Sequence, residues 1–287
     1  MRPNIVERAA MLLVVLFGVS LLSFAMSAIS PVDPAEAYVR RTSFTNVTPE
    51  KIAEARHQLG LDKPVHIQYF NWLRGALRGD LGVSLISRRA VTADIAAFLP
   101  LTLKLSGFSL LLVAVISIPL SVLCAARKNG VFDHITRGVT IIGLSMPNFW
   151  LGFLLLLVFA VIFPVFKVVE TGSGLRALLL PAFAMAIPIA SSSLRVFRAT
   201  ILSEMNKDYV AFARARGLSS RRVLWRHVLR NALPSMLTML CQYFGYTIAG
   251  CAVLERIFSL KGLGSYLIDA IIGRDLPAVN GCVLVVA

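Results

Sequence analysis

The chain has 287 residues, of which 57% are hydrophobic and 15% charged, and its net charge is +14. Soluble domains carry about 45–50% apolar and about 25% charged residues, so this composition argues against a soluble protein and favours one that crosses a bilayer. The excess of Lys and Arg then indicates cytoplasmic loops of a membrane protein and not a nucleic-acid-binding surface.

Five apolar runs are long enough to be membrane spans. The first, residues 9–29, is longer than the apolar part of a secretory signal, so we interpret it as an uncleaved span. The next four are predicted at residues 101–123, 135–163, 178–194 and 232–254, and the run over 135–163 is predicted to be kinked at Pro147. A sixth run opens near Val279 and ends at Ala287, too short for a hydrocarbon core about 30 Å thick, and is interpreted as a truncated span.

The distribution of charge predicts the orientation. Residues 195–231 carry nine Lys or Arg and two acidic residues, whereas residues 30–100 carry nine and seven. The positive-inside bias therefore places the N-terminus and residues 195–231 in the cytoplasm, and residues 30–100 outside. The predicted organisation is a first span within residues 1–29, an extracytoplasmic helical insert over 30–100, and a core transmembrane domain over 101–287.

The insert is predicted to contain two short helices. Thr48 followed by Pro49 and Glu50 is typical of a helix start, with the Thr side chain as cap, and Gly60 is placed to end that helix. A second helix is expected over residues 64–77.

The most informative stretch is residues 208–234, a short helix, a glycine and a basic amphipathic helix with a proline at the membrane entry. Ser219 or Ser220 is expected to cap the second helix. A basic loop that only follows the positive-inside rule is the plain alternative. The spacing of Ala213, Gly217 and Pro234, however, resembles the cytoplasmic signature of binding-protein-dependent ABC importer permeases, from which the chain departs with Ala211 in place of Glu and Phe212 in place of Ala.

The resemblance extends over nearly the whole chain. Six stretches, in order, are similar to the peptide/opine/nickel permease subfamily: residues 59–64, 79–84, 99–103, 145–152, 262–264 and 274–277. It implies an all-α polytopic membrane protein with the fold of an ABC type I importer transmembrane domain, in a bacterial inner membrane.

The same resemblance implies partners and sites. The partners would be a homologous permease in a heterodimer, two cytoplasmic ATPases that hold ATP and Mg²⁺, and an extracytoplasmic solute-binding protein. This chain would bind no cofactor and no metal, and it has no Gly-x-x-x-x-Gly-Lys-Ser/Thr phosphate loop. The residues expected to couple to the ATPases are Asp208, Ala211, Ala213, Arg214, Arg216, Gly217, Leu218 and Arg222. Polar groups beside a proline-broken span often line a cavity, and the candidates for the pathway lining are Ser145, Met146, Asn148, Trp150, Gln242 and Tyr246.

Two substrates and two other classes of protein remain as alternatives. The sequence Asn148-Phe149-Trp150 and the 30–100 insert resemble those of nickel permeases, which narrowly favours nickel or a metal complex, with a dipeptide or oligopeptide as the alternative. An intramembrane enzyme would need catalytic residues at membrane depth, and a channel would need a repeated filter sequence; neither pattern is found.

Overall fold

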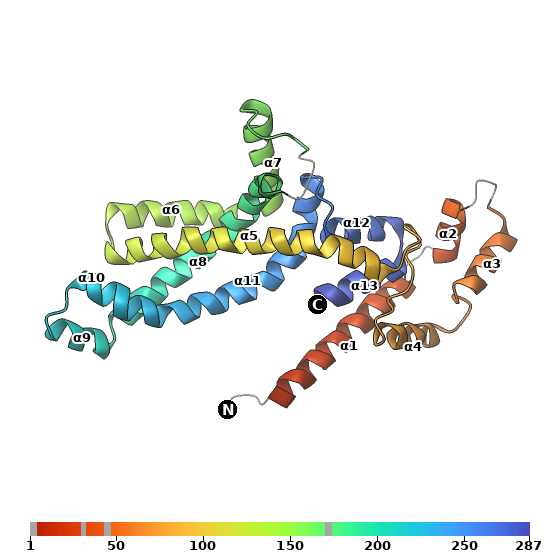
Figure 1. Cartoon of the computed structure of the whole chain (residues 1–287), viewed down its shortest axis with the longest axis horizontal. Coiled ribbons are helices and arrows are strands. Elements are labelled where there is room, and N and C mark those ends of the chain that lie inside the picture. The colour runs from red at the N-terminus through yellow and green to blue at the C-terminus, as the bar shows by residue number, and fades with distance from the viewer. Residues whose placement is uncertain (1–4, 30–32, 43–46, 170–173) are drawn as a thin grey trace. The chain divides into compact units, whose positions relative to one another are not determined.

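A computed structural model describes residues 5–29, 33–42, 47–169 and 174–287 (Figure 1). This described part is helical, and its only β-type pairing is one isolated bridge between Val83 and Ala90. The helices, in chain order, are α1 (Ile5–Ile29), α2 (Pro34–Thr42), α3 (Pro49–Gln58), α4 (Val65–Ala76), α5 (Val91–Ala126), α6 (Val131–Ser145), α7 (Asn148–Leu156), the π-helix η1 (Leu157–Ile162), α8 (Leu175–Met205), α9 (Asp208–Ala215), α10 (Ser220–Arg222), the π-helix η2 (Val223–Val228), α11 (Leu229–Ile257), α12 (Leu263–Gly273) and α13 (Leu276–Val286).

The chain forms two compact units. Unit 1 comprises residues 1–100 and 265–287, and unit 2 comprises residues 101–264. The end of the chain joins unit 1 because α13 packs along α1, where Ser23 Oγ donates to Asn280 Oδ1 at 2.6 Å. The predicted core domain of 101–287 therefore extends beyond unit 2.

The long apolar helices follow the predicted spans but are longer. By length and composition, four of the described helices can cross a membrane, or five if α6 and α7 form one span. α5 begins at Val91, within the predicted insert, and α8 continues to Met205. α8 therefore continues beyond the predicted span 178–194, because Phe197 and Ile201 are fully buried in the core of unit 2.

The proline in the third predicted span breaks the helix. α6 ends at Ser145, Met146 is extended, and α7 starts at Asn148 with its axis turned by 99°. Pro147 causes the break, because it lacks a backbone N–H and disfavours helical backbone at the residue before it. The predicted kink at Pro147 is therefore confirmed, and it is sharp enough to divide the predicted span 135–163 into two helical segments, which together qualify as one bent span by length and composition.

Both predicted helices of the insert are confirmed as α3 and α4. Gly60 follows α3 with a φ of +66°, a conformation that suits glycine. Thr48 precedes α3, but its side chain makes no capping hydrogen bond, so that detail of the prediction is wrong. The additional helix α2 packs on α3 through Ala35, Val39 and Ala55.

A buried carboxylate organises the turn after α11. Glu255 is fully buried and accepts a hydrogen bond of 2.5 Å from Thr102 Oγ1, which in turn accepts from the backbone N–H of Leu263 at 2.8 Å. Gly262 lies against this carboxylate so closely that a Cβ at residue 262 would clash with it.

We therefore expect Gly262→Ala to lower the free energy of unfolding by about 1–3 kcal/mol, the usual cost of overpacking a tight site. The measurement is thermal denaturation of the purified protein in detergent. Gly245→Ala is the matched control, because a Cβ at residue 245 meets no atom within 4 Å and alanine favours the helix. Equal melting temperatures for the two variants would contradict the role of Glu255 in this turn.

Candidate functional site

The first candidate site is the helix–turn–helix segment between α8 and α11, which we call the coupling segment (residues 206–228). Figure 1 shows α9 and α10 together at one end of α8 and α11. α9 is closed by hydrogen bonds from Gly217 N to Arg214 O (2.9 Å) and from Leu218 N to Ala213 O (3.3 Å). Gly217 takes a φ of +80°, which a glycine adopts without strain. The turn between the two helices therefore depends on this glycine.

A polar contact ties α9 to the end of α8. The Tyr209 hydroxyl donates to Glu204 Oε2 at 2.8 Å, and Lys207 Nζ lies 2.6 Å from Glu204 Oε1. Burial raises the pKa of the Tyr209 hydroxyl, and its side chain also interacts with Asn231 of α11. Tyr209 thus connects the coupling segment to both long helices.

The predicted coupling residues divide into an exposed and a buried group. Ala213 is 7% exposed and packs into the core of unit 2, so the expectation that it offers a surface to a partner is wrong. Leu218 is half-buried, and Ser219 lies at the start of α10 without a capping bond from its side chain. The exposed residues of the predicted set are Asp208, Ala211, Arg214, Arg216, Gly217 and Arg222.

The helical run that begins with α10 and continues through η2 into α11 has an exposed side that is strongly basic and also carries an aromatic residue. The residues exposed there are Arg221, Arg222, Trp225, Arg226 and Arg230, and Trp225 is 54% exposed. Val223, Leu224 and Val228 are buried on the opposite side. The sequence predicted this division of faces correctly, apart from the π-helical geometry of η2.

The second candidate site is a cavity of about 430 Å³ in unit 2, at the break between α6 and α7. Four of the six predicted pathway residues line it: Ser145, Met146, Asn148 and Tyr246. Trp150 and Gln242 do not line this cavity, although both are exposed. The break at Pro147 positions the first three residues, because it ends one helix and starts the next within the cavity wall.

Other parts of the wall come from α8 and α11 and were not predicted. They are Met185, Pro188, Ile189, Thr247 and Gly250, together with Leu144, Pro147 and Phe149 beside the break. Pro188 within a span was a usable signal, because it leaves a carbonyl without its helical partner. Apart from Thr247, the others are apolar or small, and their sequence does not distinguish them from ordinary packing residues.

Two family models match the chain. One, described as "Binding-protein-dependent transport system inner membrane component", matches residues 117–287, and the corresponding N-terminal model matches residues 1–106. The chain belongs to this family. It is therefore a multi-pass inner-membrane permease subunit of an ABC importer, with the type I transmembrane fold, and the family implies ATPases and a solute-binding protein as partners.

Curated relatives resemble this permease over almost its full length. It is 37% identical over 311 residues to the di/tripeptide transport system permease protein DppB of Pseudomonas aeruginosa (strain UCBPP-PA14), and 32% identical over 314 residues to the dipeptide transport system permease protein DppB of Escherichia coli (strain K12). It is 34% identical over 291 residues to a putative peptide transport system permease protein of Brucella abortus (strain 2308). Each alignment covers 99% of this chain and 91% of the relative. The narrow preference for nickel finds no support in these relatives, which favour the peptide alternative.

Proposed function

We propose that this permease imports dipeptides or other short peptides. The observation that carries the proposal is the full-length similarity to permeases named for di- and tripeptide or dipeptide transport. The cavity at the broken span supports it, because its wall combines apolar side chains with the polar groups of Ser145, Asn148 and Thr247. Such a wall suits a small solute that carries both amide groups and side chains.

The proposed mechanism is alternating access driven by partner subunits. The chain would pair with a homologous permease, its N-terminus and coupling segment would lie in the cytoplasm, and two ATPases would contact the coupling segments of the pair. The basic character of residues 195–231 supports this orientation. Closure of the ATPases would move α9, and the contacts of Tyr209 with Glu204 and Asn231 would transmit this motion to α8 and α11.

Uptake assays test the substrate. Cells that lack this permease and depend on an externally supplied dipeptide as a source of an essential amino acid should not grow, and the wild-type gene should restore growth. Accumulation of ⁶³Ni²⁺ should be the same in both strains. Restored nickel accumulation without restored dipeptide uptake would overturn the proposal.

A filled cavity is expected to block transport without unfolding the protein. A Cβ at Gly250 meets no atom within 4 Å, and this residue lines the cavity. We expect Gly250→Phe to reduce dipeptide uptake several-fold, because the ring occupies space that the solute needs. Gly245→Phe is the matched control, since residue 245 lies on the same helix, has equal space around it and is absent from the cavity wall. Equal uptake by the two variants, at equal membrane levels, would exclude this cavity from the pathway.

A further inference from the structure

The loop that precedes α5 is closed on itself by its backbone. Val83 and Ala90 form the isolated bridge, and the backbone N–H of Ser84 donates to Arg89 O at 2.9 Å. We call residues 83–90 the bridged loop, which belongs wholly to unit 1. Because these bonds lie within the loop, its shape does not depend on a partner.

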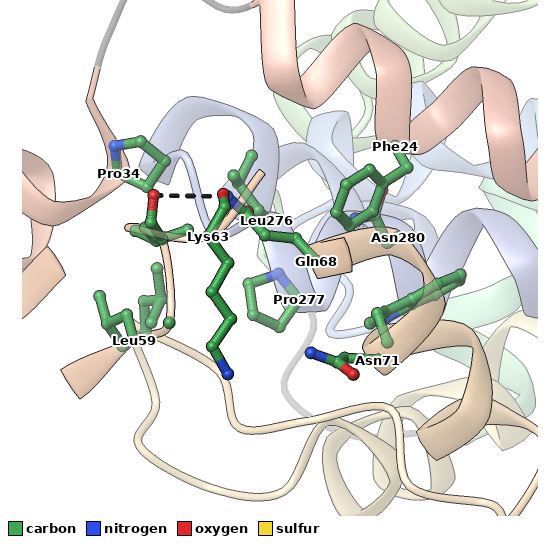
Figure 2. Close-up of a pocket in the computed structure, with 13 residues that line it drawn as sticks. Phe24, Pro34, Leu59, Lys63, Gln68, Asn71, Leu276, Pro277 and Asn280 are labelled. Carbon is green, nitrogen blue, oxygen red and sulfur yellow. Dashed lines mark hydrogen bonds between the residues drawn. The ribbon is translucent and has the colours of Figure 1, made fainter. Parts of the chain in front are cut away.

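A buried carboxylate anchors one side of the bridged loop. Asp275 is fully buried and accepts a hydrogen bond of 2.5 Å from Ser84 Oγ. The residues after it, Leu276 and Pro277, line a cavity of about 240 Å³ in unit 1 together with Leu85 of the loop. Figure 2 shows the side chains of these two α13 residues in the cavity wall. The inner side of the loop is thus attached to the start of α13.

A second buried carboxylate anchors the other side of the loop. Asp94, in the first turn of α5, is 2% exposed and accepts from Ser87 Oγ at 2.5 Å and from the Tyr266 hydroxyl of α12 at 3.2 Å. Its Oδ1 atom lies 3.5 Å from Arg89 Nε. Hydrogen bonds to a carboxylate are about twice as strong as those between neutral groups. Two such anchors make the bridged loop rigid.

The outer side of the loop combines apolar and basic side chains. Val83 is 58% exposed and Ile86 44%, and both Arg88 and Arg89 are exposed. No carboxylate among the described residues pairs with Arg88. Arginine is enriched in protein interfaces, and apolar side chains beside it supply area that a partner can bury. This outer side therefore suits contact with an acidic protein surface.

Two exposed arginines of this region have a left-handed backbone. Arg88 has a φ of +57°, and Arg274, next to the anchoring Asp275, has a φ of +58°. Glycine adopts this backbone without strain and arginine does not, so folding alone favours glycine at both positions. Strained residues of this kind cluster at functional sites. Arginine at both positions therefore indicates a use for the two side chains beyond folding.

The length of α5 places the bridged loop beyond the lipid surface. α5 follows the loop directly and has 36 residues, about 54 Å at 1.5 Å per residue. With the proposed orientation, Arg127 and Lys128 hold the other end of α5 at the cytoplasmic surface. Since a bilayer with its headgroups is about 40–45 Å thick, the first turns of α5 project about 10 Å beyond the opposite headgroups. A soluble protein can reach the loop there.

We propose that the bridged loop, together with Arg274, is the docking surface for an acidic face of the solute-binding protein. The family is binding-protein-dependent, and the proposed orientation puts the loop on the side from which this protein arrives. The surface rests on that orientation and not on the proposed substrate. Arg88 and Arg274 pair with carboxylates of the binding protein, and Val83 and Ile86 pack against apolar groups between them. Opposite charges speed association, so docking should weaken as ionic strength rises.

Binding of the importer's own solute-binding protein to the assembled importer in lipid nanodiscs tests the surface. Arg88→Glu should weaken this binding about tenfold, mainly through slower association. Lys51→Glu is the matched control, because it makes the same change of charge at an exposed position of α3 and should leave the binding unchanged. Equal affinities of the two variants would overturn the proposal.

Arg88→Gly separates docking from folding. Glycine relieves the left-handed backbone, so the melting temperature of this variant should not fall. Its docking should still weaken several-fold, because the guanidinium group is lost. A lower melting temperature with unchanged docking would show that Arg88 serves the fold alone, which contradicts the proposal.

A photoreactive side chain identifies the partner directly. p-Benzoylphenylalanine in place of Ile86 keeps the backbone N–H that donates to Asp275 Oδ2 at 3.1 Å. Illumination of the complex should give an adduct with the solute-binding protein, and an adduct with lipid or with the second permease in its place would refute the assignment. Uptake assays separate the two proposals. Normal docking without dipeptide uptake refutes only the proposed substrate, and dipeptide uptake without the adduct refutes only the docking surface.

Discussion

Replacing Gly217 by Arg is expected to abolish dipeptide uptake while the protein still inserts and accumulates in the membrane. Gly217 has a φ of +80°, so any side chain there strains the turn that joins α9 to α10. A Cβ meets no atom within 4 Å, so the variant has no steric reason to unfold the core. The arginine side chain instead projects from the exposed turn of the coupling segment, where we propose that the ATPase docks. Uptake of a labelled dipeptide, normalised to membrane levels, is the measurement.

Two further variants separate lost coupling from general backbone strain. Gly79→Arg introduces the same change at a glycine with a φ of +82° and equally open surroundings, in the turn after α4. It should retain uptake. Gly217→Asn should also retain most of the uptake, because asparagine tolerates a left-handed backbone and adds a smaller side chain. Normal uptake by Gly217→Arg would refute the assignment of the coupling segment.

The second large effect is expected at the ion pair between α6 and α8. Asp133 is fully buried and accepts from Arg198 Nε and Nη2, both at 2.6 Å. Arg198→Met leaves a buried carboxylate without its main partner, which typically costs about 3–5 kcal/mol. We therefore expect a marked fall in the melting temperature of the purified protein in detergent.

The matched control is Arg195→Met on the same helix, whose side chain is exposed and should change the melting temperature little. The double variant Asp133→Asn with Arg198→Met should recover part of the loss, because it removes the uncompensated charge. A double variant less stable than Arg198→Met would show that packing, and not the buried charge, dominates at this site.

The sequence predicted the features that depend on local chemistry. The short helices after Thr48 and Pro64, the turn at Gly217 and the cavity residues beside Pro147 all follow from capping, glycine or proline patterns, and the structure contains each of them. Their causes lie within a few residues along the chain, so a single sequence suffices to find them.

Features that depend on distant contacts could not be predicted in this way. α8 extends past residue 195 because Phe197 and Ile201 pack into a core assembled from several helices. Ala213 is buried for the same reason, although a small residue on a basic segment reads equally well as a surface position. Trp72 lines a cavity that exists only in the folded arrangement of α1, α4 and α13.

The continuous helical run Ser220–Ile257 has a mechanical consequence. It spans 38 residues, about 57 Å at 1.5 Å per residue, and carries the arginines of the coupling segment near one end and Tyr246 of the cavity wall further along. If such a run moves as a rigid body, a small rotation at one end becomes a displacement of several ångströms at the other. Pro234 is the only proline within this run, and it is the position where the helix can bend. With the orientation and pathway proposed above, we expect the stiffness of this helix on either side of Pro234 to set how much of a displacement at the coupling segment reaches the cavity wall.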